Sequence, residues 1–316
     1  MTRSQIAPLP QGLDLGVEFR IDHTLGQGGF GITYLVTCLS DIDDRVVEGK
    51  RYVVKEFAMS SCVYRSGDGI RFEPRGASEE EQKFCWSVFS KEVAKFGQEA
   101  RTLAMFRHTN VVEVLLIRHA NNTAYMVMEF VDGEPLSGRI SRSLRETGCG
   151  LTWPELKPIA TDMMDALQLV HQRGVIHRDI KPANIMLRDT GQAVLIDFGG
   201  ARSTAKARFS MVFTPGLAAL EQLHNFHNAD QSEDQLAEIL PATDIYSLAA
   251  TFYYAMTGTP PYNMDDSNQV TGHRPALYKH PLQSRLELPD GVAKAIDWAL
   301  NFENAAARPQ TVSEWR

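Results

Sequence analysis

The sequence predicts an α+β protein with two lobes, a small antiparallel-sheet lobe with one main helix and a larger, mostly α-helical lobe. The 316 residues correspond to about two folding units. The hydrophobic periodicity changes from strand-like to helical near residue 130. With 43% hydrophobic and 22% charged residues, the composition is that of a globular protein and excludes disordered and collagen-like chains.

The first lobe is predicted from short runs of β-branched and aromatic residues, which are typical of strands. Between the last two runs, Asn121-Asn122 predicts a hairpin turn. An apolar repeat on one helical face, from Val93 to Leu103, predicts a helix over 91–106. The predicted strands are 34–37, 52–57, 111–117 and 125–130.

The second lobe is predicted to be helical. Thr152 and Glu155 have the spacing of a capping box, and Gly174 provides a stop for the helix that follows it. Residues 245–256 are apolar nearly all round, which indicates a buried helix, and 292–300 form another. Residues 313–316 lie at the start of a further predicted helix, and a cut from a longer protein is one interpretation of that end.

Charge and cysteine content narrow the class of protein. The net charge of −7 argues against nucleic acid as the main partner. The four cysteines form no C-x-x-C pair, which indicates buried free thiols in a reducing compartment. No run of ~18 apolar residues occurs, so no membrane span is predicted in this chain. The expected location is the cytoplasm, although a membrane-tethered protein or a secreted effector would look alike over these residues.

The glycines Gly26, Gly28 and Gly31 form a G-x-G-x-x-G pattern, which lets backbone amides approach phosphates. A strand-like run follows, whereas a dinucleotide-binding Rossmann turn would be followed by a helix. A glycine hairpin between two strands therefore fits better. Lys55 lies within an apolar strand, where the alternative is a surface lysine. Glu99 lies on the apolar face of the predicted helix, where a carboxylate is costly to bury unless it is paired, and Lys55 is its natural partner. An exposed Glu99 is the alternative.

The strongest signal is the string from His177 to Asn184, which contains Asp179 and is followed by Asp197-Phe198-Gly199. Asparagine and aspartate offer hard oxygens to Mg²⁺, which leaves the other aspartate to accept a hydroxyl proton. Chance gives this spacing in about a few chains per thousand, so a solvated turn is a poor explanation.

These pieces, in this order, resemble a eukaryotic-type protein kinase from about residue 17 to the end of the chain. The resemblance implies the bilobal protein-kinase-like fold, with an N-terminal extension over 1–16, an N-lobe over 17–130 and a C-lobe over 131–316. An insertion at about 58–90 and the string Gly-Gly-Phe-Gly-Ile-Thr-Tyr resemble a bacterial branch of serine/threonine kinases. A mobile solvated insertion is the alternative.

The resemblance also implies a role for each matching residue. The glycines would cover the ATP phosphates, Lys55 would bind the α and β phosphates, and Glu99 would hold Lys55. Asp179 would be the catalytic base and Lys181 would lie near the γ-phosphate. The remaining implied positions are the Mg²⁺ ligands Asn184 and Asp197, the adenine hinge with Glu129 and Val131, and Met186 under adenine.

Further positions match supporting parts of the family. Asp244 resembles the buried acid that braces the catalytic loop, and Glu221 with Arg308 resembles the ion pair that anchors the activation segment. Ser203, Thr204 and Ser210 are the expected autophosphorylation sites, while Thr214 is expected to shape the substrate site.

The resulting expectation is a protein serine/threonine kinase that uses ATP and Mg²⁺, with Mn²⁺ as the alternative ion, on serine and threonine hydroxyls of protein substrates. A pseudokinase that acts as a nucleotide-dependent binding or scaffold module is the alternative. A small-molecule phosphotransferase ranks below both, because such enzymes usually lack the full His-Arg-Asp-Ile-Lys-Pro string.

Overall fold

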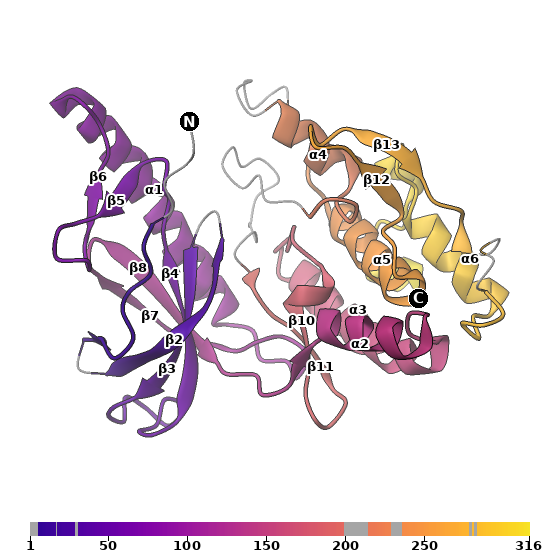
Figure 1. Cartoon of the computed structure of the whole chain (residues 1–316), viewed down its shortest axis with the longest axis horizontal. Helices are drawn as coiled ribbons and strands as arrows, with labels where there is room; N and C mark the ends of the chain where they lie inside the picture. Colours follow the sequence, from indigo (N-terminus) through magenta and orange to yellow (C-terminus); the bar gives the residue numbers. More distant parts are fainter. Residues whose placement is uncertain are drawn as a thin grey trace. The chain divides into compact units, whose positions relative to one another are not determined.

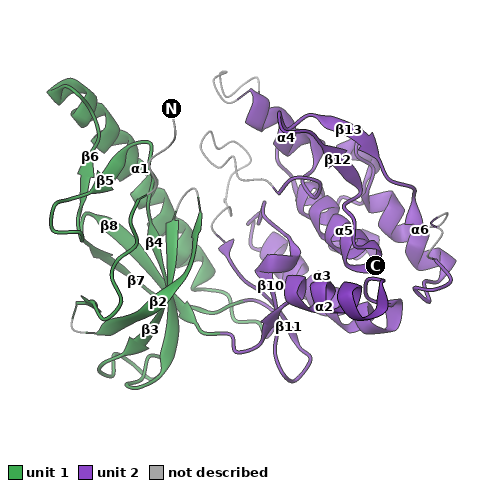
Figure 2. Ribbon diagram, in the orientation of Figure 1, with its two compact units in different colours: residues 1–108, 112–130 green, residues 109–111, 131–316 purple. Residues whose placement is uncertain are grey.

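The structure is a computed structural model that describes residues 6–16, 18–28, 31–198, 214–228, 236–277, 280 and 283–316. The chain forms two compact units (Figure 2). The N-terminal unit comprises Met1–His108 and Val112–Phe130, and the C-terminal unit comprises Thr109–Val111 and Val131–Arg316. Each unit is described by itself below.

An antiparallel sheet of six strands, in the order β1-β2-β3-β4-β8-β7, forms the N-terminal unit (Figure 1). The predicted turn at Asn121-Asn122 is confirmed, and both residues have positive φ, 54° and 63°, as the tightest hairpin turns require. The predicted strand over 111–117 begins three residues later than expected. The strands are β1 (Asp14–Leu15), β2 (Phe19–Gly28), β3 (Gly31–Cys38), β4 (Arg51–Phe57), β7 (Val114–Ala120) and β8 (Thr123–Glu129).

The main helix of this unit is α1 (Glu79–Leu103), so the boundaries predicted at 91–106 were wrong. The helix starts early because Ser78 caps it: the Oγ of Ser78 accepts a hydrogen bond from the Glu81 N–H at 3.2 Å. Three glutamates occupy the first turn, where the helix dipole favours negative charge.

The segment 58–90 is described throughout and packs on the sheet. It contains the hairpin β5 (Val63–Arg65) and β6 (Phe72–Pro74), followed by the first turns of α1. Phe89 of α1 is fully buried, with its ring centroid 5.6 Å from that of Phe57 and 5.8 Å from that of Phe72. The hairpin is therefore joined to the core of the unit by aromatic packing.

Helices dominate the C-terminal unit, as predicted. Glu155 accepts the Thr152 N–H at 2.9 Å, which confirms the capping box. The helices are α2 (Leu136–Thr147), α3 (Trp153–Gln172), α4 (Leu220–His227), α5 (Pro241–Thr257), α6 (Asp290–Ala299) and α7 (Val312–Trp315), with 3-10 turns η1 (Pro182–Asn184) and η5 (Ala305–Ala307). The strands are β9 (Glu134–Pro135), β10 (Ile185–Leu187), β11 (Ala193–Leu195), β12 (Tyr262–Met264) and β13 (Val270–His273).

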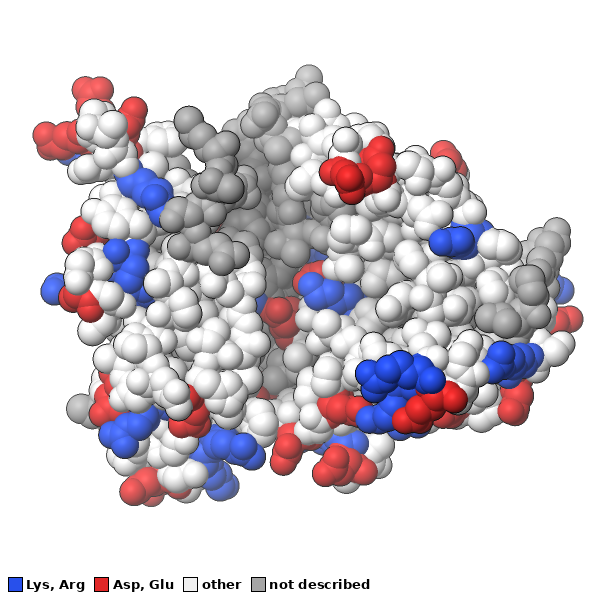
Figure 3. All heavy atoms as spheres, viewed as in Figure 1, with Lys and Arg blue, Asp and Glu red and all other residues white. Residues whose placement is uncertain are grey.

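Helix α5 forms the centre of this unit, because nearly all of its residues are buried. It begins after Leu240 and ends at Gly258, whose φ of 74° provides the left-handed stop. No helix among the described residues has both the length and the apolar character needed to cross a membrane. On the face drawn in Figure 3, acidic and basic side chains are interspersed in both units.

Candidate active site

Asp179 is the centre of the predicted catalytic loop, which runs between α3 and β10. The residue is buried, and each oxygen of its carboxylate has a partner. The Oδ2 accepts hydrogen bonds from Lys181 Nζ at 2.8 Å and from Asn184 Nδ2 at 3.1 Å. The Oδ1 accepts one from the Thr214 hydroxyl at 3.2 Å. The carboxylate is therefore held in place while its Oδ1 contacts a hydroxyl group.

Asp244, at the start of α5, fixes the backbone of this loop. Its Oδ2 accepts the His177 N–H at 2.8 Å and its Oδ1 accepts the Arg178 N–H at 2.7 Å. His171 adds a contact to Oδ2 at 2.9 Å. Burial alone would raise the pKa of Asp244, but the hydrogen bonds from His171 and from the Arg178 N–H hold that pKa below its ordinary value. The brace expected at Asp244 is thus present.

The His177 ring is fully buried and packs on Phe198, with 4.6 Å between the ring centroids. Its Nδ1 accepts the Asp179 N–H at 3.3 Å, and its Nε2 lies 3.2 Å from the carbonyl oxygen of Ile196. The neutral ring, with its hydrogen on Nε2, satisfies both contacts. Burial lowers the pKa of His177, so the ring stays neutral at physiological pH.

Asn184 and Asp197 lie at the same end of the β10–β11 hairpin. Ile185 pairs with Leu195, and the Ile196 N–H donates to the Asn184 carbonyl at 2.9 Å. The Asn184 Nδ2 is committed to Asp179, so its Oδ1 is the atom that it can offer to a cation. One carboxylate and one amide oxygen fit Mg²⁺, which is usually held by few protein ligands and by substrate phosphates.

This donor set is small, as a magnesium site of that kind requires. Within the part of the chain that the structure describes, no group of three or more His, Cys, Asp or Glu side chains could enclose a metal ion. The residues present therefore fit an ion that is shared with a bound phosphate better than a closed structural metal site.

The ion pair expected between Glu221 and Arg308 is present. Arg308 is almost fully buried, and its Nη1 and Nη2 lie 2.7 Å and 3.1 Å from the two Glu221 oxygens. Thr243 donates a further hydrogen bond to Glu221 at 2.7 Å. Next to this pair, Gln222 donates to the carbonyl oxygen of Arg178 at 2.7 Å. Gln222 thus connects α4 to the catalytic loop, a role that sequence reasoning missed.

The nucleotide-binding residues expected in the N-terminal unit lie on its sheet and helix. Lys55 is on β4, two residues before Phe57, so the two side chains share a face of the strand. Phe57 packs on Phe96 of α1, at 5.4 Å between ring centroids, and Glu99 lies one turn beyond Phe96. Lys55 therefore lies on the face of β4 from which Phe57 packs on α1, the helix that carries Glu99.

The three glycines differ in what surrounds them. A Cβ at Gly31 would lie 2.6 Å from the backbone oxygen of Glu56 and 3.5 Å from the Cε of Lys55. Glycine is needed there because the backbone of β4 is too close. At Gly26 and Gly28 no described atom lies within 4 Å of such a Cβ. The packing of the described residues therefore does not require glycine at these two positions.

The residues expected to contact adenine are divided between the two units. Glu129 ends β8, and its N–H donates to the Glu113 carbonyl at 3.0 Å. Val131 begins the longer segment of the C-terminal unit and is buried. Met186 is the middle residue of β10, between Pro135 on β9 and Val194 on β11. The expected phosphorylation sites Ser203, Thr204 and Ser210 lie outside the described residues.

Sequence reasoning missed a buried ion pair beside Lys55. Glu56 has no exposed surface, and its oxygens accept two hydrogen bonds from Arg65 at 2.9 Å and 2.8 Å. The hydroxyls of Tyr34 and Tyr125 each donate to Glu56 at 2.9 Å. The one sequence signal for Glu56 is its position next to Lys55 on the same strand, because its hydrogen-bond partners come from distant segments of the chain.

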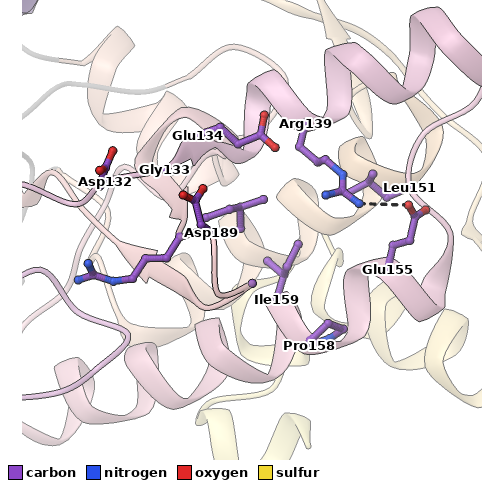
Figure 4. A pocket seen from close by; sticks show the side chains of 12 residues that line it. Asp132, Gly133, Glu134, Arg139, Leu151, Glu155, Pro158, Ile159 and Asp189 are labelled. Carbon is purple, nitrogen blue, oxygen red and sulfur yellow. Dashed lines mark hydrogen bonds and ion pairs between the residues drawn. The ribbon is translucent and has the colours of Figure 1, made fainter.

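A separate pocket of about 560 Å³ lies in the C-terminal unit (Figure 4). Its lining includes the aliphatic side chains of Leu151, Ile159 and Leu187. At one end Arg139 pairs with Glu155, with 3.4 Å between nitrogen and oxygen. None of the predicted catalytic, nucleotide or metal residues lines this pocket, so it is distinct from the site around Asp179.

Comparisons with known proteins agree with this geometry. Residues 79–304 match the family described as Protein kinase domain. Serine/threonine-protein kinase PknA of Mycobacterium tuberculosis (strain ATCC 25618 / H37Rv) is 33% identical over 246 residues, which cover 72% of this chain and 51% of PknA. PknB of the same strain is 30% identical over 226 residues, which cover 70% of this chain and 34% of PknB.

The chain thus spans about half the length of PknA and about a third of PknB. A solved structure described as the PpkA-294 apo form resembles this one with a TM-score of 0.68 and 27% identity, over 98% of both chains. The described elements, an antiparallel-sheet unit with one main helix and a helical unit, are those of the expected bilobal fold. Because the family match covers well over half of its residues, the chain belongs to the protein kinase family, in the bacterial serine/threonine branch.

Proposed function

We propose that this protein transfers the γ-phosphate of Mg-ATP to serine and threonine hydroxyls of protein substrates. The observation that supports this most directly is the Asp179 carboxylate, whose Oδ1 accepts a hydrogen bond from the Thr214 hydroxyl while Lys181 holds Oδ2. A substrate hydroxyl would have to make the same contact to lose its proton.

In this mechanism Asp179 orients the acceptor hydroxyl and takes its proton as the new oxygen–phosphorus bond forms. The bond between the γ-phosphorus and its bridging oxygen breaks, and ADP leaves. Lys181 carries a positive charge next to Asp179 and offsets the charge on the transferred group. Most of the rate enhancement comes from holding these groups in place, which is what Asp244 does for the loop backbone.

Lys55 would bind the α and β phosphates, with Glu99 as its partner, and the glycine hairpin would cover the phosphates through Gly26, Gly28 and Gly31. Glu129, Val131 and Met186 would surround adenine. These roles rest on the match to the family, and the space around Gly26 and Gly28 supports a ligand there.

Asn184 and Asp197 would hold the metal ion. When bound, Mg²⁺ neutralises phosphate charge and fixes the phosphate oxygens. Mg²⁺ is the proposed ion and Mn²⁺ is the alternative, since oxygen donors suit both. The proposed partners are ATP and protein substrates, without nucleic acid, and the proposed location is the cytoplasm.

We further propose that the protein phosphorylates itself at one or more of Ser203, Thr204 and Ser210. A phosphate dianion opposite an arginine can order a loop, and Arg178 precedes the catalytic aspartate. The sequence around these sites also carries Arg202 and Arg208.

Mass spectrometry after incubation with Mg-ATP tests the proposal. Intact mass and peptide mapping would be recorded for the protein and for Asp179→Asn and Asp197→Asn. Asp189→Asn, an exposed acid in the same unit, is the matched control. We expect phosphate on residues 200–213 of the protein and of Asp189→Asn, and none on the other two variants.

Other outcomes would identify the alternatives. ATP that raises the Tm without adding phosphate to the protein or to a generic protein acceptor would favour the pseudokinase. Phosphate transfer to small molecules alone would favour a small-molecule phosphotransferase. Phosphate that persists in Asp179→Asn and Asp197→Asn would contradict the assigned roles of both residues.

A further inference from the structure

Two of the four cysteines meet where the β5–β6 hairpin lies against α1. Cys62 directly precedes β5, and all four cysteines are reduced. The Cys62 carbonyl accepts the Arg75 N–H at 2.8 Å, which extends the hairpin ladder by one pair. Arg75 and Cys85 border the same shallow hollow on the surface. Cys85 therefore lies beside the residue that is paired with Cys62.

The packing of α1 leads independently to the same position. Phe89, one turn after Cys85, is fully buried against Phe72 of β6, so this face of the helix is turned toward the hairpin. Cys85 lies one turn nearer the start of the helix, and Arg75 lies three residues beyond Phe72. The step from Phe89 back to Cys85 along the helix and the step from Phe72 on to Arg75 along the hairpin both lead to the end of the hairpin that contains Cys62.

The two thiols are close enough to influence each other. Burial raises the pKa of the Cys62 thiol, and the neighbouring Cys85 raises it further. Cys62 is 8% exposed, whereas Cys85 is half-buried and borders the open hollow. The two sulfur atoms thus differ in access: solvent reaches Cys85 more easily than Cys62.

We propose that Cys62 and Cys85 form a redox modification site, which closes to an intrachain disulfide when the protein meets a hydroperoxide. The Cys85 thiol loses its proton, and the thiolate attacks one oxygen of hydrogen peroxide. The O–O bond breaks, a sulfenic acid is formed, and the departing hydroxide takes up that proton and leaves as water. The Cys62 sulfur then attacks the sulfenic sulfur, the S–O bond breaks, and a second water leaves. Two thiols are oxidised and one hydrogen peroxide is reduced to two waters.

The bond would connect the hairpin to the helix that carries Glu99. On the same hairpin Arg65 holds Glu56, the residue next to Lys55. The modification site therefore joins α1, which carries Glu99, to the hairpin whose Arg65 pairs with the strand neighbour of Lys55. The inference itself concerns covalent chemistry and does not depend on the proposed phosphotransfer.

Peptide mapping of the whole chain tests the inference. Reduced protein would be treated with increasing hydrogen peroxide, quenched, and digested with trypsin without reductant. Cleavage leaves Cys62 in 56–65 and Cys85 in 84–91, with no other cysteine in either peptide. We expect these two peptides to be linked, with a mass lower by two hydrogen atoms than their sum, and dithiothreitol to separate them.

Single variants test which of the two thiols reacts first with the peroxide. In Cys62→Ser, Cys85 should stop at the sulfenic acid and be labelled by dimedone, whereas in Cys85→Ser the Cys62 thiol should remain unlabelled. Cys62→Ala provides a second variant in case the serine disturbs folding. Cys38→Ser and Cys149→Ser are the matched controls and should keep the link.

Three results would overturn the inference. The first is oxidation of Cys85 without a link to Cys62, and the second is a Cys85 that resists peroxide while the other cysteines react. The third is a link between different molecules, which a mixture of ¹⁵N-labelled and unlabelled protein would reveal as peptides of mixed isotope content.

Discussion

Replacing Asp244 by asparagine tests how the catalytic loop is held. Asp244 has no exposed surface, and its two oxygens accept the N–H groups of His177 and Arg178 at 2.8 Å and 2.7 Å. Asparagine keeps one acceptor oxygen and replaces the other with an NH₂ donor. Whichever way the amide is turned, one buried backbone N–H faces another donor.

The loss in free energy of unfolding can be worked out from that lost hydrogen bond. A buried donor without an acceptor costs about 1–3 kcal/mol, and a hydrogen bond to a charged acceptor contributes about 1.5–3 kcal/mol. We therefore expect Asp244→Asn to lower the free energy of unfolding of the C-terminal unit by about 3 kcal/mol at neutral pH. Asp179 would also be less well placed, and a displacement of about 1 Å costs about 10²-fold in kcat.

Urea denaturation and phosphate transfer to a generic protein acceptor measure the two effects. Asp266→Asn, an exposed aspartate in the same unit, is the control and should match the unaltered protein. An Asp244→Asn protein whose free energy of unfolding lies within about 0.5 kcal/mol of the unaltered protein would refute the reasoning, because that is the scatter of ordinary surface changes.

The effect of Asp244→Asn on the free energy of unfolding should depend on pH. Because the pKa of Asp244 is lowered in the folded protein, its contribution to stability is complete above about pH 4, the ordinary value for aspartate. The contribution is lost as the pH falls through the lower pKa of the folded state. The difference in free energy of unfolding between the unaltered protein and Asp244→Asn should therefore shrink in acid.

Three further changes have distinct expected outcomes. Because burial lowers the pKa of His177, the free energy of unfolding should fall as the pH drops below about 6.5, and urea melts of His177→Gln should show a weaker dependence. Arg65→Met leaves the buried Glu56 carboxylate without its cation and should cost about 3–5 kcal/mol in the same assay, whereas a loss below about 1 kcal/mol would contradict a buried pair. Gly31→Ala should lower the Tm because its Cβ meets the β4 backbone, while Gly28→Ala should leave the Tm unchanged and raise the KM for ATP; equal Tm values for the two would contradict this distinction.

Elements whose structure is determined by residues close together in the sequence could be predicted from it. The turn at Asn121-Asn122 needs positive φ, which asparagine tolerates, and both residues adopt it. The apolar run after Asp244 had to be a buried helix, and α5 is one. The catalytic string was readable for a related reason: its residues are close together in sequence, so their spacing fixes their geometry.

The start of α1 could not be found from periodicity. Its first turns are polar and exposed, so the apolar repeat that identifies an amphipathic helix is absent there. The remaining local signal is Ser78 with Glu81 three residues later, which is the spacing of a cap. The acidic run that follows has two explanations in the sequence, a solvated insertion or a dipole-stabilised first turn, and tertiary packing at Phe89 decides between them.

Glu56 shows why the partners of a site are harder to predict than the site. Lys55 and Glu56 are neighbours on opposite faces of β4, and only Lys55 matches a family motif. The partners of Glu56 come from β3, β5 and β8, so their identity depends on strand register and on the fold of the hairpin. Burying a carboxylate completely is costly unless a cation accompanies it. Arg65 supplies that cation, so the hairpin is part of the core of the N-terminal unit and its contribution follows from the burial of Glu56.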